Sequence, residues 1–378
     1  MNTPRYLKTL SVVGARPQFI KAAVVSKAIL ESGWLHEVIV HTGQHYDEAM
    51  SQVFFDELRI PKPKYNLEVG SGTHGHTTGQ MLSGIERVIL EERPDWVLVY
   101  GDTNSTLAGA LAAAKLHVPV AHIEAGLRSF NKRMPEEINR ILTDHVSSLL
   151  FCPTTTAVRN LKKEGVKEGI HHVGDVMYDA ALLFGSIAER QSDILRQLQL
   201  LPESYYLATV HRAENTDDPA RLMGIFEALD RIAAEENPIV LPLHPRTRAA
   251  LLRDHLASLI EGSNGTDAGI ATKNKHLRLI CPVSFLDMVM LERHARAILT
   301  DSGGIQKEAY FHGIPCVTLR EETEWTETVE VGWNRLAGND PKVICECVRS
   351  LSGQREIIEE YGNGDSAKVL VDIMGEFQ

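Results

Sequence analysis

The sequence predicts an α/β protein built from two doubly wound, Rossmann-like domains. Short apolar runs alternate with longer helical patterns along the whole 378-residue chain, which is the pattern of parallel sheets covered by helices. These runs lack strict polar alternation, as expected of strands that are buried on both faces. Ten or more such strands are too many for one open sheet in a domain of ordinary size, so they divide between two domains.

The predicted strands fall into two groups. They are residues 9–13, 37–41, 96–100, 118–123, 149–152, 206–210, 239–243, 277–281, 297–300 and 316–319. Helical patterns between them include residues 17–31, closed by Gly33, and residues 104–115 and 136–145. A charged helical region without a strand signal, between Val173 and Tyr205, predicts a first domain of residues 1–175 and a second of residues 200–356.

Composition narrows the class of protein. Apolar residues make up 43% of the chain and charged residues 24%, values typical of globular proteins and not of disordered ones. The formal net charge is −11 and no long basic run is present, which argues against a nucleic-acid partner. No apolar stretch approaches the roughly 18 residues of a membrane span. Five cysteines without a CxxC pair are typical of reduced core thiols, so we expect a cytoplasmic protein.

Ligands of doubly wound folds bind beyond the carboxyl ends of the strands, so the residues after each predicted strand are site candidates. The first strand is followed by Gly14, Arg16 and Pro17, and the helix that begins there carries Lys21. Such a helix start offers amides and a positive dipole to an anion, and Arg16 adds a forked donor. A tight turn with a solvated arginine is the alternative, and the GxGxxG pattern of dinucleotide-binding sites is absent.

Three acidic residues of the first half are predicted to converge on one crevice. Asp102 follows a strand, although a helix N-cap would also explain it, and Glu124 stands at the carboxyl end of an apolar run with no lysine nearby in the sequence. Glu136 begins a helix, whose positive end is a sufficient reason for it, and Asn139 and Arg140 share its face. Crowded carboxylates repel one another, and one can acquire a raised pKa suited to proton transfer.

The second half supplies groups of a different kind. His211 and Arg212 follow a predicted strand, and the segment His244–Arg246 repeats the pattern one strand later. A lone histidine there would more often be a satisfied core residue, but an arginine directly after it favours a site.

The segment Thr300–Glu308 is a strand end, a Gly-Gly turn and a helix start. The Ser302 hydroxyl and the amides after Gly303 and Gly304 can grip a diphosphate, and Glu308 can accept hydrogen bonds from ribose hydroxyls. The chain has no metal-binding HExxH and no P-loop, so we expect neither a metal nor a cofactor. A sugar joined to a nucleoside diphosphate fits these predicted groups best.

Eight segments in unbroken order resemble the non-hydrolysing UDP-N-acetylglucosamine 2-epimerase family. They are GARPQFIK, HTGQHYD, YGDTNSTLAG, HIEAGLRS, PEEINR, VHRAEN, LHPR and TDSGGIQKEA. The resemblance implies a glycosyltransferase-B-like pair of domains facing across a cleft, a homodimer, and a C-terminal helix of about 357–378 that packs back on the first domain.

The reaction implied by the resemblance interconverts UDP-GlcNAc and UDP-ManNAc, for the synthesis of surface polysaccharide precursors. UDP is eliminated to give a 2-acetamidoglucal and then adds back, without a cofactor. By motif, the catalytic candidates are Asp102, Glu124, Glu136 and His211. The UDP-sugar is bound by Arg16, Lys21, Arg140, Arg212, Ser302, Gly303, Gly304 and Glu308, with His211 also beside the UDP. Which carboxylate acts on which face of the sugar stays open.

Two segments depart from the family pattern. Members acting on UDP-GlcNAc often have TERPE where residues 323–327 are TEWTE, and residues 70–76 differ from the stretch that in several members helps to bind an activating UDP-GlcNAc. With residues 130–134, these segments resemble more closely the branch acting on UDP-2,3-diacetamido-2,3-dideoxy-glucuronate. Lys132 or Arg133 can pair with that substrate's carboxylate, although a solvated basic loop explains them equally well.

We expect UDP-GlcNAc first and the uronate second, and allosteric activation stays open. A glycosyltransferase would share the fold and the UDP cradle but needs fewer inward carboxylates. A non-catalytic sensor would have lost the acids, all of which are present.

Overall fold

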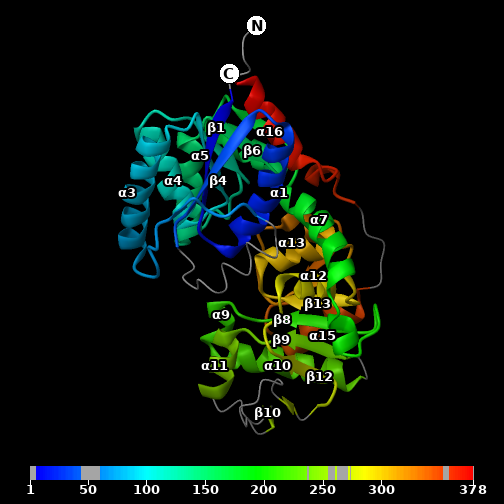
Figure 1. Cartoon of the computed structure of the whole chain (residues 1–378). Coiled ribbons are helices and arrows are strands. Elements are labelled where there is room, and N and C mark those ends of the chain that lie inside the picture. Colours follow the sequence, from blue (N-terminus) through cyan, green and yellow to red (C-terminus); the bar gives the residue numbers. More distant parts are fainter. Residues whose placement is uncertain are drawn as a thin grey trace. The chain divides into compact units, whose positions relative to one another are not determined.

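The computed structural model describes residues 6–43, 60–235, 238–253, 260–261, 271–272, 274–351 and 357–377. The chain forms two compact units, one of Met1–Leu183 with Glu359–Gln378 and one of Phe184–Ile358 (Figure 1). The border lies within helix α7 (Val176–Gln191). Residues 44–47 of the HTGQHYD motif lie outside the described residues.

A seven-stranded sheet forms the centre of the first unit, in the order β3-β2-β1-β4-β5-β6-β7. Every neighbouring pair in it is parallel. The strands are β1 (Leu7–Val13), β2 (Leu35–His41), β3 (Tyr65–Asn66), β4 (Trp96–Tyr100), β5 (Val120–Ile123), β6 (Leu149–Cys152) and β7 (Ile170–His172).

The second unit contains a six-stranded parallel sheet in the order β12-β9-β8-β13-β14-β15, the 3-2-1-4-5-6 order of a Rossmann fold. Its strands are β8 (Tyr206–Thr209), β9 (Ile239–Pro242), β12 (Leu277–Ile280), β13 (Ala297–Thr300), β14 (Cys316–Thr318) and β15 (Asn334–Leu336). A separate antiparallel pair joins β10 (Ile260–Glu261) to β11 (Ala271–Thr272). The predicted α/β class with two parallel sheets is confirmed.

All ten predicted strands are present, whereas β3, β7, β10, β11 and β15 were not predicted. Each of these five is only two or three residues long and includes a polar residue, so none produces an apolar run.

Helices connect successive strands in both units. They are α1 (Arg16–Ser32), α3 (His74–Glu92), α4 (Asn104–Lys115), α5 (Pro135–Val146), α6 (Thr155–Lys163), α7, α8 (Ile194–Gln197), α9 (Ala213–Thr216), α10 (Pro219–Ala234), α11 (Pro245–Arg253), α12 (Phe285–Arg293), α13 (Gly303–Phe311), α14 (Thr326–Glu330), α15 (Pro341–Arg349), the 3-10 turn η2 (Glu359–Tyr361) and α16 (Ser366–Glu376). Gly33 ends α1 in the left-handed conformation, at φ 72°, which is the reason for a glycine there.

The C-terminal helix α16 belongs to the first unit, where it lies beside α1 (Figure 1). Its N-terminus is capped by Asp179, whose two carboxylate oxygens accept hydrogen bonds from the amides of Ser366 and Ala367 at 3.2 and 2.7 Å. At its other end Gly375 lies so close to the Trp34 ring that an added Cβ would be 3.0 Å from it. Among the described helices, none is long and apolar enough to cross a membrane.

The sheets place the candidate residues at their carboxyl edges. The parallel register sets Val12 against Val99 and Tyr100 against Ile123, so β1, β4 and β5 end side by side. The turns that follow them, at Gly14, Asp102 and Glu124, therefore lie at one edge of the first unit's sheet.

Candidate active site

The turn after β1 is held by its own helix. The Oε1 atom of Gln18 accepts hydrogen bonds from the amides of Gly14 and Ala15 at 2.8 and 3.0 Å. The sequence predicted that the amides of this turn are available to an anion. For the amides of Gly14 and Ala15 this is wrong, because both already donate to the Gln18 side chain. Gly14 has a packing reason instead, since a Cβ there would lie 2.2 Å from the Ser105 hydroxyl. Arg16, the first residue of α1, is exposed.

Glu124 forms an ion pair with Lys21 of α1, and both side chains are largely buried. The backbone of Glu124 has φ 70°, a left-handed conformation that is costly for a residue with a Cβ and is concentrated at functional sites. Its amide and that of Ala125 both donate to the Phe151 carbonyl, at 3.1 and 3.0 Å, which holds the turn in place. The lysine that the local sequence lacks therefore comes from a helix 103 residues earlier.

Asp102 is bound from two sides by α5. Arg140 donates through Nη2 to Asp102 Oδ2 at 2.6 Å, and Asn139 donates through Nδ2 to the Asp102 carbonyl at 2.9 Å. Burial raises the pKa of the Asp102 carboxyl; the charge of Glu124 acts in the same direction, whereas Arg140 and Lys21 oppose it. Two carboxylates and two cations thus interact at the ends of β4 and β5.

The neighbouring acids Glu136 and Glu137 of α5 have different surroundings. Glu136 is exposed, and its side chain forms no hydrogen bond or ion pair with a residue that the structure describes. Glu137 is buried and accepts hydrogen bonds from the amides of Ser129 and Phe130 at 2.9 Å and from Arg140 Nη1 at 2.9 Å. Burial alone would raise the pKa of Glu137, but these hydrogen bonds lower it overall. Arg140 is therefore shared between Glu137 and Asp102, whereas the sequence pattern associated it with Glu136.

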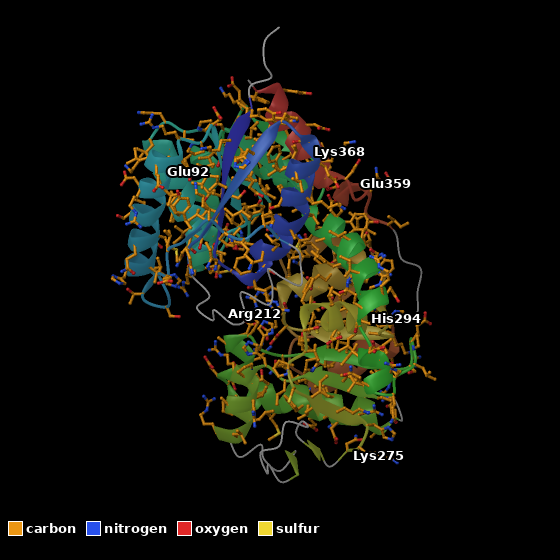
Figure 2. All side chains as sticks on the ribbon, in the orientation of Figure 1. Glu92, Arg212, Lys275, His294, Glu359 and Lys368 are labelled. Atoms are coloured by element: carbon orange, nitrogen blue, oxygen red, sulfur yellow. The ribbon has the colours of Figure 1, made fainter. Side chains whose placement is uncertain are left out.

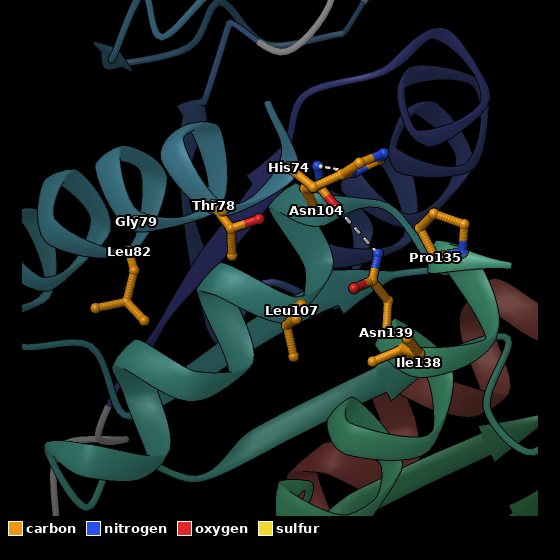
Figure 3. A pocket seen from close by; sticks show the side chains of 10 residues that line it. His74, Thr78, Gly79, Leu82, Asn104, Leu107, Pro135, Ile138 and Asn139 are labelled. Carbon is orange, nitrogen blue, oxygen red and sulfur yellow. Dashed lines mark hydrogen bonds between the residues drawn. The ribbon is translucent and has the colours of Figure 1, made fainter. Parts of the chain in front are cut away.

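A pocket of about 330 Å³ opens beside the Asp102 turn, between α3, α4 and α5 (Figure 3). His74 and Gly75 line it from α3, in the stretch that departs from the family's activator-binding pattern. Asn104 donates to His74 Nδ1 at 3.2 Å and accepts from Asn139 at 3.3 Å. Since Asn139 also contacts the Asp102 carbonyl, hydrogen bonds connect this pocket to the acidic residues.

In the second unit, the buried carboxylate of Asp301 holds the turn that follows β8. It accepts hydrogen bonds from the amides of His211 and Arg212 at 3.0 Å and from Asn215 Nδ2 at 3.1 Å. Arg212 itself lies where the chain leaves β8 and enters α9 (Figure 2). Burial lowers the pKa of His211 and Asp301 opposes that shift. The ring of His211 is 5.3 Å from the ring of His244.

The Gly-Gly turn after β13 begins α13. Ser302 is the N-cap of that helix, and its hydroxyl accepts from the amide of Ile305 at 3.5 Å. A Cβ at Gly303 would meet its nearest neighbour, the Glu324 carboxylate, only at 3.4 Å, and one at Gly304 would meet the Ser302 hydroxyl at 3.8 Å. These are ordinary contacts, so packing among the described residues does not require either glycine.

The segment TEWTE is in direct contact with this turn. The indole Nε1 of Trp325 donates to the Gly303 carbonyl at 2.9 Å, and the buried ammonium of Lys307 lies 3.9 Å from the centre of the Trp325 ring. Glu324 is paired with Arg320 at 3.0 Å. Burial by itself would raise the pKa of Glu324, but Arg320 and then Arg212 lower it overall. The departure from the family motif thus adjoins the predicted diphosphate cradle.

The structure groups the predicted residues by unit. It brings together Asp102, Glu124, Lys21 and Arg140 in the first unit, and His211, Arg212, Ser302 and Gly303 in the second. Gly304 is exposed and Glu308 is half-buried. No group of three or more histidine, cysteine or acidic side chains is placed to hold a metal ion among the described residues.

Several supporting residues were missed by the sequence reasoning. They are Gln18, Glu137 and Asp301. Asp301 precedes Ser302 directly and could have been found by its place at a strand end, and Gln18 by its place at the third position of α1, where a glutamine often closes a capping box. The hydrogen bonds of Glu137 to the Ser129 and Phe130 amides have no such local signal.

Two Rossmann-type units, one with paired acids and one with a glycine turn at the ends of parallel strands, fit an enzyme that acts on a nucleotide-linked sugar. The family model described as UDP-N-acetylglucosamine 2-epimerase matches residues 27–375. The chain therefore belongs to the UDP-N-acetylglucosamine 2-epimerase family, and it is a nucleotide-sugar 2-epimerase, an isomerase.

Two relatives match over nearly their full length. UDP-2,3-diacetamido-2,3-dideoxy-D-glucuronate 2-epimerase of Pseudomonas aeruginosa is 52% identical over 98% of this chain and 100% of the relative. A protein named UDP-N-acetylglucosamine 2-epimerase homolog, from Methanococcus maripaludis, is 51% identical over 97% of this chain and 99% of the relative.

A solved structure is also similar. It is the crystal structure of Methanocaldococcus jannaschii UDP-GlcNAc 2-epimerase in complex with UDP-GlcNAc and UDP, which has a TM-score of 0.86 and 44% identity and covers 98% of this chain and 100% of that one. The predicted family and the glycosyltransferase-B-like fold class are thereby confirmed.

Proposed function

We propose that this protein inverts carbon 2 of a UDP-linked 2-acetamido sugar by elimination and re-addition of UDP. The carbon-2 proton of such a sugar is weakly acidic, so its direct removal is implausible. In the elimination, a carboxylate takes that proton while the bond between carbon 1 and the UDP oxygen breaks, leaving a 2-acetamidoglucal. UDP then adds back to carbon 1 as a proton is delivered to the opposite face of carbon 2.

The observation that carries this proposal is the charge arrangement at the ends of β4 and β5. Asp102 and Glu124 are each paired with a cation, and the pKa of Asp102 is raised. A carboxyl group whose pKa is raised keeps its proton to a higher pH than a free one, which suits it to accept and return a proton. We assign Asp102, Glu124 and Glu136 jointly to proton transfer. The assignment does not say which of them acts on which face of the sugar. Lys21 and Arg140 hold the first two in place.

We assign the departing UDP to the second unit. The Ser302 hydroxyl and the amides at the start of α13 donate hydrogen bonds to the diphosphate, Arg212 and His211 lie beside it, and Glu308 accepts from the ribose hydroxyls. Fixed donors of this kind stabilise a charge as it develops on a leaving group. The two glycines support the assignment, because an added Cβ would make only ordinary contacts at Gly303 and Gly304 and packing therefore does not explain them. Arg16, exposed at the start of α1, is assigned to the substrate as well.

We propose UDP-2,3-diacetamido-2,3-dideoxy-glucuronate as the preferred substrate and UDP-GlcNAc as the second candidate. This reverses the order expected from the sequence alone. Support comes from Trp325, the residue that replaces the family's common arginine, because its indole contacts the Gly303 carbonyl directly. The 52% identity to the Pseudomonas enzyme also supports it. UDP-GlcNAc is retained because relatives named for it are 51% and 44% identical.

The test is nuclear magnetic resonance of the purified chain with each UDP-sugar in heavy water. Deuterium entering at carbon 2 without an acceptor sugar or NAD supports the epimerase reaction, and the substrate with the larger kcat/KM identifies the preference. Transfer to an added acceptor without exchange at carbon 2 would instead indicate a glycosyltransferase. We also propose that the protein is a cytoplasmic homodimer. Sedimentation velocity tests the oligomeric state.

A further inference from the structure

A buried histidine of β5 contacts the turn that carries Asp102. His122, on β5, is fully buried and comes two residues before Glu124. Its Nε2 atom is 2.7 Å from the carbonyl oxygen of Gly101, the residue before Asp102. Its Nδ1 atom is 2.7 Å from Oδ1 of the buried Asp144.

Both partners of the His122 ring are acceptors. A carbonyl oxygen carries no proton, so the contact with Gly101 requires hydrogen on Nε2. The Asp144 carboxylate also accepts from Arg128 Nη1 at 2.7 Å and from the amide of Gly126 at 3.1 Å. Burial alone would raise the pKa of Asp144, but His122 and Arg128 lower it overall, so this carboxylate is ionised and cannot donate. The ring is therefore held from its Nδ1 side by Asp144 and from its Nε2 side by the Gly101 carbonyl.

We propose that His122 is a positioning residue of the epimerase reaction, a buried ring that donates to the Gly101 carbonyl and thereby fixes the Asp102 carboxylate. The Gly101 peptide is held by β5 on both sides, since its amide also donates to the Ile123 carbonyl at 3.0 Å. Gly101 has φ 62°, so this hydrogen-bonded turn adopts a conformation that few residues other than glycine maintain.

The His122 ring contacts two groups of charged residues through its two nitrogens. Its Nδ1 atom contacts Asp144, which pairs with Arg128. Its Nε2 atom contacts the Gly101 carbonyl, and the next residue, Asp102, belongs to the set Asp102, Arg140, Glu124 and Lys21. This inference rests on the proposed function, because it assigns Asp102 to proton transfer.

Two substitutions separate the two hydrogen bonds of the ring. His122→Gln places an amide nitrogen about where Nε2 lies and keeps a donor for Gly101, whereas His122→Asn reaches only as far as Nδ1. We expect His122→Asn to lower kcat about 100-fold, as misplacement of a reacting group by about 1 Å does. KM and the Kd of UDP should change less than about twofold, and His122→Gln should recover about tenfold of the loss. Equal kcat losses in both variants, or wild-type kcat in His122→Asn, would overturn the proposal.

The wild-type protein provides a measurement that does not depend on the variants' folding. Histidine-selective ¹⁵N spectra should show hydrogen on Nε2 of His122, in the absence and presence of UDP. An Nε2 atom without hydrogen would overturn the proposal, because the hydrogen bond to the Gly101 carbonyl could not then form. Failure of the proposed function has a different signature, since the wild-type chain would then exchange no carbon-2 hydrogen with any UDP-sugar while its ¹⁵N spectrum stayed as expected.

Discussion

The two units share a strand order but use their strand ends in opposite ways. In the first unit, the residues after β4 and β5 are charged and paired, Asp102 with Arg140 and Glu124 with Lys21. In the second, the buried Asp301 holds the backbone after β8, and the turn at Gly303 leaves room for an added Cβ. The same scaffold thus carries paired charged side chains at the strand ends of the first unit and a held backbone turn with a glycine at those of the second. Function therefore depends on the side chains at strand ends and not on the fold.

This difference agrees with the two steps of the proposed reaction, which are proton transfer and the departure of UDP. Proton transfer requires carboxylates whose protonation is tuned by neighbouring charges. Departure of UDP requires donors that surround a diphosphate without reorganising. Changes in the first unit should therefore affect kcat, and changes in the second should affect UDP binding.

The largest effect is expected for Glu124→Gln. The amide cannot exchange a proton as the carboxylate does, so kcat should fall about 10²–10⁴-fold. The Kd of UDP, measured by titration calorimetry, should remain within a factor of about two because this residue is assigned no UDP contact. Asp102→Asn should behave in the same way. Near-normal turnover in both variants would contradict the assignment of these acids.

Glu136 and Glu137 offer a matched pair on one helix. Glu136→Gln should lower kcat about 100-fold and leave the unfolding temperature unchanged, because the exposed side chain makes no described contact. Glu137→Gln should destabilise the protein by about 1–3 kcal/mol, since it weakens a buried carboxylate that accepts several hydrogen bonds. Thermal unfolding and the deuterium-exchange assay measure the two effects. A large loss of stability in Glu136→Gln would exclude a purely catalytic role for it.

Gly303→Ala tests whether the glycine is needed for UDP binding or for the stability of the fold. An added Cβ has ordinary contacts of 3.4 Å or more, and alanine favours a helix over glycine by up to about 1 kcal/mol. The unfolding temperature should therefore stay constant or rise. The affinity for UDP should fall about tenfold, because the methyl group occupies the space assigned to the diphosphate; a loss of 1.4 kcal/mol corresponds to that factor. Unchanged UDP affinity would show that the diphosphate binds elsewhere.

Trp325→Arg tests the choice of substrate. The substitution restores the family's common residue and places a second cation near Lys307, which now lies against the indole. The ratio of kcat/KM for UDP-GlcNAc to that for the uronate should rise about tenfold, the size expected when one contact in a binding pocket changes. Trp325→Phe is the control, because it keeps a ring over Lys307 and loses only the hydrogen bond to Gly303. A ratio that is the same in all three proteins would remove Trp325 from substrate selection.

The sequence predicted those parts of the molecule that depend on local pattern. Apolar runs and capping residues located the ten principal strands and the helices α1, α4 and α5, because burial and periodicity are local properties. The partners of the acids could not be predicted in this way. Lys21 meets Glu124 across 103 residues, and Arg140 turns from the expected Glu136 to Glu137 and Asp102. Such pairings depend on strand register and helix rotation, which a linear pattern does not determine.

The smallest predicted effect concerns the pH dependence of kcat/KM. Arg140 opposes the burial that raises the pKa of Asp102, so Arg140→Met should raise that pKa further. A group with a higher pKa becomes protonated at higher pH, and the acid limb of the profile should therefore move to higher pH. The charge of Glu124 raises the pKa of Asp102, whereas Arg140 lowers it. Removal of Glu124 should therefore move the acid limb of any residual activity to lower pH. Arg140→Lys keeps the charge and should retain the wild-type limb. If the limb stayed in place in Arg140→Met, the ionisation that limits activity would belong to a group other than Asp102.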